Sequence, residues 1–440
     1  MAQERDELNK RRQEREARRK QRQAEQQKLK IKLALAAVAL VLSGVGISML
    51  TKDMGSGAQD AVSVIATEAP TEAATEAATE APTESGRYNT PTTVVHIKAA
   101  GDLTVTDKVV ASADTDLGYD YSGAFLDVAP LLADADLTML NYEGNLVGPP
   151  YGTASASAPQ ELMTALADAG VDIVQMANSY SIHNGMIGLA TTLNNIRAAG
   201  IEPVGAFATN ADFKAAKGYT ICNVQGVKVA VVAFTKGMGG LGLPAGSENC
   251  VNVLYTDYAT EYRKVNKDGI TNILKNLAEE APDITIAMLH WGSEYNDTIS
   301  ETQQDIVKLM QKNGVDVILG THSHRVQELS YDSATGNFVA YSLGDFFGDG
   351  AKDGTKYSIL LDLEITKDNE TGITKVTDFS YTPLYILSEA ESKRGRQVVR
   401  IAETMSAYDV NFVDKVVSSA YTGMQSSLTR ISNRVVGKYK

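Results

Sequence analysis

The chain has 440 residues, a hydrophobic content of 43% and a net charge of −13, and residues 1–32 alone hold twelve Lys and Arg against six Asp and Glu. Residues 33–440 therefore carry −19, the difference between −13 and +6, which excludes nucleic acid and an anionic membrane surface as partners bound by bulk electrostatics. The two cysteines, Cys222 and Cys250, form no CxxC pair, which excludes a thiolate zinc finger and leaves a disulfide open.

Two segments of unusual composition begin the chain. Residues 1–32 are highly charged, and we interpret them as a basic cytoplasmic tail, with RNA binding as the alternative. Residues 33–50, LALAAVALVLSGVGISML, contain no charged side chain, and a membrane-spanning helix needs about 17–25 such residues. Because the basic residues precede this segment, the positive-inside rule predicts an uncleaved signal anchor in the cell membrane with an extracellular main domain.

A low-complexity segment follows at residues 51–91. It repeats Thr, Glu, Ala and Pro, as in ATEAPTEAATEAATEAPTES. Such a segment buries too little apolar surface to offset its conformational entropy, so we expect a disordered, extended stalk. An anchor followed by a stalk suits a domain held away from a membrane, as across a Gram-positive cell wall.

Strand-like and helical patterns alternate from residue 92 onward. Apolar runs predict strands at 93–100, 135–142, 171–178, 201–207, 219–224, 227–234, 283–291, 315–320, 337–346 and 356–366. Apolar spacings of three and four predict helices at 158–170, 185–200 and 301–314. This alternation predicts an α/β domain over residues 92–388. Strands without intervening helices, at 201–234 and 326–384, indicate a sandwich of sheets with helices outside, and 389–440 reads as a C-terminal helical extension without an assigned role.

Polar side chains interrupt the pattern where strands end, and in open α/β sheets such ends build the site. The side chains able to bind a metal ion there are Asp102, Asn141, Glu143, Asn178, His183, His290, Glu294, His322 and His324. Four of the five histidines of the chain lie at these ends, and only His96 lies within a strand. The alternative is that these residues cap helices or hold loops.

The HSH spacing of His322 and His324 predicts that both rings face one point, because residues i and i+2 of an extended segment lie on one side. Their imidazoles are suitable donors for a divalent transition metal. Carboxylates of Asp102 and Glu143 would add oxygen ligands and could bridge two ions about 3.5–4 Å apart. The sequence thus predicts a site for one or two divalent ions, such as Mn, Fe or Zn.

Seven segments, in this order, resemble the CapA family of poly-γ-glutamate capsule synthesis. They are AGDLTV, ADLTMLNYEGNL, VDIVQMAN with the helix and RAAGIEPVGA after it, VKVAVVAFT, LHWGSEY, GVDVILGTHSHRVQE and VAYSLGDFF. The resemblance extends over about residues 95–347. It implies a fold similar to calcineurin-like metallophosphatases, a β-sandwich flanked by helices with a metal centre at one end.

The resemblance also implies roles for individual residues. The residues that match the family's motifs as metal ligands are Asp102, Glu143, Asn178, His290, His322 and His324. Glu294 matches the last position of H-x-G-x-E and is a candidate catalytic residue. Two positions differ from the family pattern, since Ser323 stands where Pro is usual and Asp345 where Asn is usual.

One motif departs sharply from the family, which reads ANNHxxDxG where this chain has ANSYSIHNG. Ser179 stands for an Asn that supplies a metal ligand, and Tyr180 for a His that donates a proton to the leaving group. With an ordinary pKa of about 10, a tyrosine is a poor acid near neutral pH. His183 is a candidate to swing in and replace the missing imidazole. We therefore expect that a metal centre survives while phosphatase chemistry is weakened.

Three functions remain open on this basis. The first is a CapA-like protein for synthesis, export or anchoring of poly-γ-glutamate or a related anionic surface polymer, in contact with a membrane synthase complex. The second is an active metal-dependent hydrolase of a phosphoester or of the polymer. The third is a non-catalytic binding module on a stalk. No GxxxxGK[ST] occurs, so the chain should not power polymerisation itself, and the Gly-rich residues 237–242 indicate a loop over the site.

Overall fold

The computed structural model describes residues 91–409, 416–435 and 438–439. The expected tail, membrane anchor and stalk, apart from residue 91, lie outside these residues, so their predictions stay predictions. Within the described part of the chain, no helix combines the length and apolar character that crossing a membrane requires.

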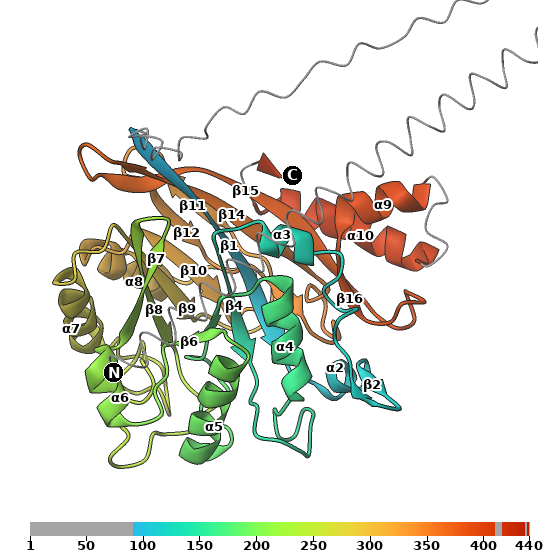
Figure 1. Cartoon of the computed structure of the whole chain (residues 1–440), viewed down its shortest axis with the longest axis horizontal. Helices are drawn as coiled ribbons and strands as arrows, with labels where there is room; N and C mark the ends of the chain where they lie inside the picture. Colours follow the sequence, from blue (N-terminus) through green and yellow to red (C-terminus); the bar gives the residue numbers. More distant parts are fainter. Residues whose placement is uncertain (1–90, 410–415, 436–437, 440) are drawn as a thin grey trace, which may run out of the picture. The chain divides into compact units, whose positions relative to one another are not determined.

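Two β-sheets face each other and form the centre of the folded unit (Figure 1). The first sheet has nine strands in the order β16-β15-β14-β1-β4-β5-β6, with β13 beside β1 and β17 beside β15. Its strands are β1 (Thr92–Thr104), β4 (Leu137–Glu143), β5 (Ile173–Gln175), β6 (Glu202–Val204), β13 (Asp345–Phe347), β14 (Tyr357–Asp368), β15 (Thr374–Leu387), β16 (Gln397–Arg400) and β17 (Lys438–Tyr439).

The second sheet has six strands in the order β11-β12-β10-β9-β8-β7. They are β7 (Tyr219–Val224), β8 (Val227–Thr235), β9 (Ile284–His290), β10 (Val317–Thr321), β11 (Leu329–Asp332) and β12 (Asn337–Ala340). A separate short hairpin consists of β2 (Asp114–Thr115) and β3 (Gly118–Tyr119).

Both sheets contain a run of parallel strands, which reaches the β6 edge of the first sheet and lies in the middle of the second. In the first sheet β1 pairs with β4, β4 with β5 and β5 with β6, all in parallel. In the second, β9 is parallel to both β8 and β10. Every residue of β4 and β9 is buried, as expected for parallel strands covered on both faces. The carboxyl ends of these strands carry the polar residues singled out in the sequence.

Helices cover the outer faces of the sheets. Helices α4 (Gln160–Ala169) and α5 (Gly185–Ala198) add their leucines to the core that contains the first sheet. Helices α7 (Lys267–Ala278) and α8 (Glu301–Lys312) bury their apolar faces with the second sheet in a separate core. The other helices of the described residues are α2 (Asp107–Ala111), α3 (Ala129–Ala133), α6 (Asn210–Ala216), α9 (Ile401–Asp409) and α10 (Ser418–Ser432).

The predicted α/β sandwich agrees with this architecture, but three elements differ from the prediction. The single strand expected at 337–346 is divided between β12 in the second sheet and β13 in the first, and α7 was not predicted. Residues 201–234 were expected to lack a helix, but α6 lies between β6 and β7. Thr209 caps this helix by accepting a hydrogen bond from the backbone N–H of Asp212, and no residue of α6 is buried. Because only Phe213 of this helix packs against a core, and only in part, its sequence lacks the apolar periodicity on which the prediction depended.

The C-terminal segment is part of the same folded unit. The expected helical pattern of 389–440 is present as α9 and α10, and the segment also supplies strand β16, which pairs with β15. No disulfide joins Cys222 to Cys250.

Candidate metal centre

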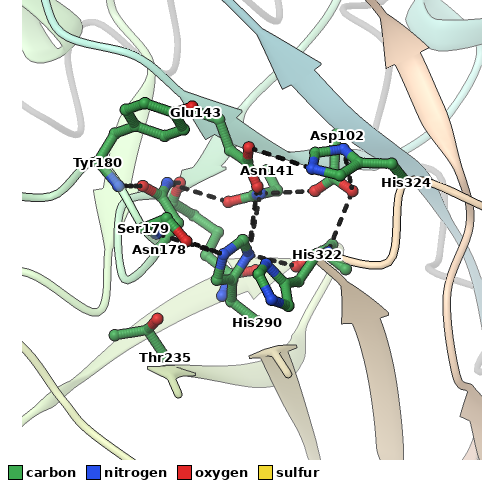
Figure 2. A network of polar contacts seen from close by, with 12 residues as sticks. Asp102, Asn141, Glu143, Asn178, Ser179, Tyr180, Thr235, His290, His322 and His324 are labelled. Carbon is green, nitrogen blue, oxygen red and sulfur yellow. Dashed lines mark hydrogen bonds and ion pairs between the residues drawn. The ribbon is translucent and has the colours of Figure 1, made fainter. Parts of the chain in front are cut away.

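Side chains from several strand ends converge on one buried point between the sheets (Figure 2). Asp102 comes from β1 and Glu143 from the last position of β4. His290 ends β9, and His322 and His324 follow β10. All five side chains are at most 6% exposed. Four segments that lie far apart in the sequence therefore place metal-capable groups together.

A close backbone approach fixes the position of Asp102. Its backbone N–H donates to the carbonyl oxygen of Gly344 over 2.9 Å. A Cβ atom on the preceding residue, Gly101, would lie 1.7 Å from that same oxygen. Only glycine fits at position 101, because any side chain there would push β1 away from the segment that leads into β13.

The first group of donor atoms combines Glu143 with His290 and His322, whose ligand atoms all lie within 4.8 Å of one another. Nδ1 of His290 lies 3.4 Å from a carboxylate oxygen of Glu143. The rings of His290 and His322 have their centroids 4.4 Å apart. Nδ1 of His322 is buried, and none of the described residues gives it a hydrogen-bond partner, so this nitrogen is available to bind a ligand.

The second group combines Asp102, Glu143 and His324, again within 4.8 Å. Nε2 of His324 lies 3.8 Å from Glu143, and its Nδ1 lies 3.7 Å from Asp102. The same Nδ1 lies only 2.8 Å from a carboxylate oxygen of Asp345. Glu143 belongs to both groups and is therefore placed to bridge them.

Two asparagines support the acidic side chains. The amide nitrogen of Asn141 donates to Asp102 over 2.6 Å and to Glu143 over 3.2 Å. Its amide oxygen accepts a hydrogen bond from the side chain of Asn178. The amide oxygen of Asn178 accepts from the backbone N–H of Tyr180. Asn178, expected as a ligand, is thus placed as a support for Asn141, with its polar atoms engaged within the protein.

Burial and mutual repulsion determine the charges of the carboxyl groups. Burial raises the pKa of Asp102 to about 6, although the nearby His324 opposes the shift. Burial also raises the pKa of Glu143 well above its ordinary value, and Asp102 and Asp345 add to the effect. Carboxyl groups in such a site bind protons unless a bound cation replaces those protons.

The three histidines fall into two classes. Burial, reinforced by the neighbouring histidines, lowers the pKa of His290 well below its ordinary value. Burial together with Lys236 does the same for His322, so both rings are neutral. For His324 burial acts in the same direction, but the carboxylates of Asp345 and Glu143 outweigh it and raise its pKa well above the ordinary value.

The backbone at the HSH segment differs from the expected extended form. His322 and His324 have φ angles of 85° and 57°, in the left-handed region that L-residues rarely adopt. The side chains converge because the chain bends after β10, and the predicted i, i+2 alternation of a strand is wrong here. Such strained backbone at functional groups persists only where the surrounding structure holds it.

The divergent motif contributes two side chains to the centre. The hydroxyl of Ser179 lies 3.1 Å from Nε2 of His290, and the backbone N–H of Ser179 donates to the same nitrogen over 3.2 Å. Tyr180 lies beside Glu143 in Figure 2. Burial, with Glu143 nearby, raises the pKa of Tyr180 to about 12, so this phenol holds its proton at neutral pH. Ser179 is thus part of the cluster, whereas Tyr180 is a weaker acid than its free side chain.

The other two expected catalytic residues lie outside the donor groups. His183 is exposed, and its Nε2 lies 3.1 Å from the carbonyl oxygen of Ala154. The expectation that His183 replaces the missing imidazole is therefore not met, because its ring is engaged on a different loop. Glu294 is exposed and lines a cavity that adjoins His322.

Two contacts were missed by the reading of the sequence. Asp345 was noted only as a replacement for the usual Asn, but it makes the shortest side-chain contact of His324. Tyr295 stacks on the ring of His324, with centroids 5.4 Å apart and planes at 24°. The Asp345 substitution was visible in the sequence, whereas the tyrosine had no signal.

The residues present fit a divalent transition metal. The donor set of imidazoles and carboxylates is one that such ions prefer. A buried, unpartnered nitrogen on His322 and buried carboxyl groups with raised pKa values are costs that a bound cation would relieve. Because both groups contain Glu143, the arrangement is compatible with one bound ion or with two that share this ligand.

Comparisons with known proteins agree with the sequence motifs. The capsule biosynthesis protein CapA of Bacillus anthracis is 29% identical over 269 residues, which cover 59% of this chain and 61% of that protein. The PGA biosynthesis protein CapA of Bacillus subtilis is 28% identical over 218 residues, which cover 50% of this chain and 53% of that protein. The chain thus spans only 53% to 61% of the length of these curated relatives.

Solved structures of phosphatases are more distant. A novel phosphatase of Mycoplasma pneumoniae is 14% identical with a TM-score of 0.39, covering 67% of this chain and 94% of that one. The calcineurin-like phosphoesterase YfkN of Bacillus subtilis is 16% identical with a TM-score of 0.39, covering 77% and 98%. These values are too low to bear on activity.

A protein-family model matches more than half of the chain. The model described as bacterial capsule synthesis protein PGA_cap matches residues 96–349, which is more than half of the chain. The matched range contains both donor groups, from Asp102 to His324, and Asp345. This protein therefore belongs to the family of bacterial capsule synthesis proteins described as PGA_cap.

Proposed function

We propose that this chain is a membrane-anchored, extracellular metal-binding protein that serves the synthesis, export or anchoring of poly-γ-glutamate or a related anionic surface polymer. The observation that carries the proposal is the pair of buried donor groups that share Glu143. Family membership supports the link to a capsule, and the apolar residues 33–50 support the anchor.

The donor groups suggest which residues would hold the metal. His290 and His322 offer neutral imidazole nitrogens, Asp102 and His324 form the other side, and Glu143 reaches both. A bound divalent ion would polarise a phosphoryl or carbonyl oxygen and lower the pKa of a bound water. The chain's own part is to keep these side chains buried and oriented, through Asn141 on the acidic side and Ser179 on His290.

Proton donation to a leaving group is the weak step of a hydrolase built on this site. Tyr180 stands in the position of the family's imidazole, and its pKa of about 12 keeps its proton bound near neutral pH. His183 is engaged with Ala154 and does not supply the missing acid. A role in binding and positioning the polymer is therefore favoured over rapid phosphoester hydrolysis.

Hydrolysis remains the second candidate because a cavity of about 300 Å³ adjoins His322 and Ser179. A ligand group in this space would lie against the first donor group. Slow hydrolysis of a phosphoester with a good leaving group, which needs no protonation, is the activity that the site would support.

The test is to incubate the full chain, purified in mild detergent with Mn²⁺, with poly-γ-glutamate and separately with p-nitrophenyl phosphate. We expect polymer binding that is lost in EDTA and recovered when Mn²⁺ is restored. Fast, metal-dependent release of p-nitrophenol without polymer binding would favour the hydrolase. Polymer binding that is unchanged by EDTA would instead indicate a non-catalytic binding module without a metal.

A further inference from the structure

The cavity beside the first donor group contains a cation whose role the metal centre does not explain. Its lining includes Ser179, Lys236, Gly239, Tyr262, Glu294 and His322. Lys236 directly follows the last residue of β8, so it extends from the same sheet edge as His290. A ligand in this cavity would therefore meet both Lys236 and the metal-binding imidazoles.

The ammonium group of Lys236 is held in place by neutral partners. Its Nζ donates to the carbonyl oxygen of Gly292 over 2.6 Å and lies 4.8 Å from the centre of the Tyr262 ring. Within the described residues, no carboxylate oxygen comes within the 4.0 Å of an ion pair with Lys236, and Glu294 attracts it only from a longer distance. Burial lowers the pKa of this half-buried amine, and an anionic ligand in the cavity would favour its charged form.

The glycine-rich loop holds this arrangement tightly. A Cβ atom on Gly237 would lie 2.4 Å from the carbonyl oxygen of Tyr258 and 2.5 Å from the ring of Tyr262. Glycine at this position therefore lets the Tyr262 ring pack against the loop that carries Lys236. The loop also passes over the divergent motif, since a Cβ atom on Gly239 would lie 3.5 Å from the carbonyl oxygen of Ser179.

The cavity brings Lys236 and a metal-binding imidazole to one point, since Lys236 and His322 both line it. A metal ion on His290 and His322 would repel the Lys236 ammonium, and an anionic group between the two would relieve that repulsion. Because residues 33–440 carry a net charge of −19, an anionic ligand also needs such a local cation to approach.

We propose that Lys236 binds an oxyanion group of the ligand, a phosphate or a carboxylate, in the cavity next to His322, and so determines that the site accepts anionic ligands. The inference rests on the proposed function, since it concerns the ligand of the same site. A point-charge ammonium beside the Ser179 hydroxyl suits either oxyanion, because neither group demands the two-pronged geometry of an arginine.

The test compares oxyanion binding by the full chain in detergent and by two variants, Lys236→Gln and Lys236→Met, using calorimetric titration with inorganic phosphate and, separately, with acetate. The glutamine keeps a neutral donor for Gly292, and the methionine keeps the apolar stem against Tyr262. We expect both variants to bind the preferred oxyanion about tenfold more weakly or worse, since a charged hydrogen bond is lost. The arm that shows this loss identifies phosphate or carboxylate as the ligand group.

The matched control is Lys352→Gln. Lys352 also lies over a tyrosine, 6.0 Å from the centre of the Tyr295 ring, but does not line this cavity. Its substitution should change the affinity less than about twofold. Each titration is run on metal-loaded and metal-free protein, with metal content and melting temperature measured in parallel. A loss of oxyanion affinity that occurs only in the Lys236 variants, with or without metal, supports the inference even if the chain binds no metal. Equal oxyanion affinities of the wild type and both Lys236 variants, in metal-loaded and metal-free protein alike, overturn it.

Discussion

The two donor groups of the centre share Glu143 but differ in their electrostatics. In the first group, His290 and His322 are neutral imidazoles, and Nδ1 of His322 has no hydrogen-bond partner in the part of the chain that the structure describes. In the second, His324 is held as a cation by Asp345, 2.8 Å away. A metal ion can enter the first group without displacing a proton from a histidine, whereas in the second it competes with the proton on His324. The first group should therefore bind its metal ion more tightly than the second group does.

The largest expected effect comes from removing the shared ligand. Glu143→Gln takes a carboxylate from both groups, so we expect metal affinity to fall at least about 100-fold and metal content to drop to background. Elemental mass spectrometry of the purified protein measures this. Glu294→Gln is the matched control, because that carboxylate is exposed and belongs to neither group, and retention of metal by Glu143→Gln would contradict the shared role.

Single histidine substitutions separate the two groups. His322→Ala should remove the tighter ion, while His324→Ala should leave it bound and remove only the weaker one. Metal equivalents measured after dialysis against a fixed low concentration of Mn²⁺ report the difference. His183→Ala serves as control because its ring is exposed and bonded to Ala154. If His324→Ala instead loses the more tightly held ion, the ranking of the two groups is reversed.

The pH dependence of metal uptake should differ between the groups. Protons compete with metal at Asp102, whose pKa is about 6, and at Glu143 and His324, whose pKa values are raised. Affinity should therefore rise with pH, and more steeply for the second ion, because the first group already has neutral imidazoles. Calorimetric titration with Mn²⁺ at pH 6, 7 and 8, in buffers of different ionisation enthalpy, gives the protons released per ion. Equal proton release for both ions would remove the proposed distinction.

A smaller effect is expected from Asp345→Asn, which restores the residue usual in the family. Without the carboxylate the pKa of His324 should fall, so uptake of the second ion should begin about one pH unit lower or more. The first ion should bind as before. Asp332→Asn is the control, since that exposed carboxylate accepts a hydrogen bond from the backbone N–H of Ala334 in the turn between β11 and β12. An unchanged pH profile in Asp345→Asn would show that Asp345 does not control the charge of His324.

Much of this architecture could be predicted from the sequence because the governing signals are local. Apart from Thr285, the buried runs β9 and β10 contain no polar side chain until their last residues, and His290 marks the end of the first. The helix α6 could not be predicted from periodicity, because it buries no residue. The sequence predicts which candidate ligand residues come together. It does not predict the backbone conformation that brings them together, since the left-handed φ angle of His322 depends on the tertiary structure.

The polar supports were less visible still. Asn178 reads as a ligand in its motif, yet its amide is used to hold Asn141 and the backbone of Tyr180. Whether an amide points to a metal or to its neighbours depends on contacts between strands that sequence spacing does not encode. The same holds for Lys236, whose place in the site depends on the loop that carries Tyr262.

Metal content of the full chain, purified without a His-tag and analysed by elemental mass spectrometry, tests the central claim most directly. The two donor groups around Glu143 predict one or two equivalents of manganese, iron or zinc, with the second equivalent lost first as the pH is lowered. No bound metal, even after reconstitution with each of these ions at pH 8, would contradict the proposed centre.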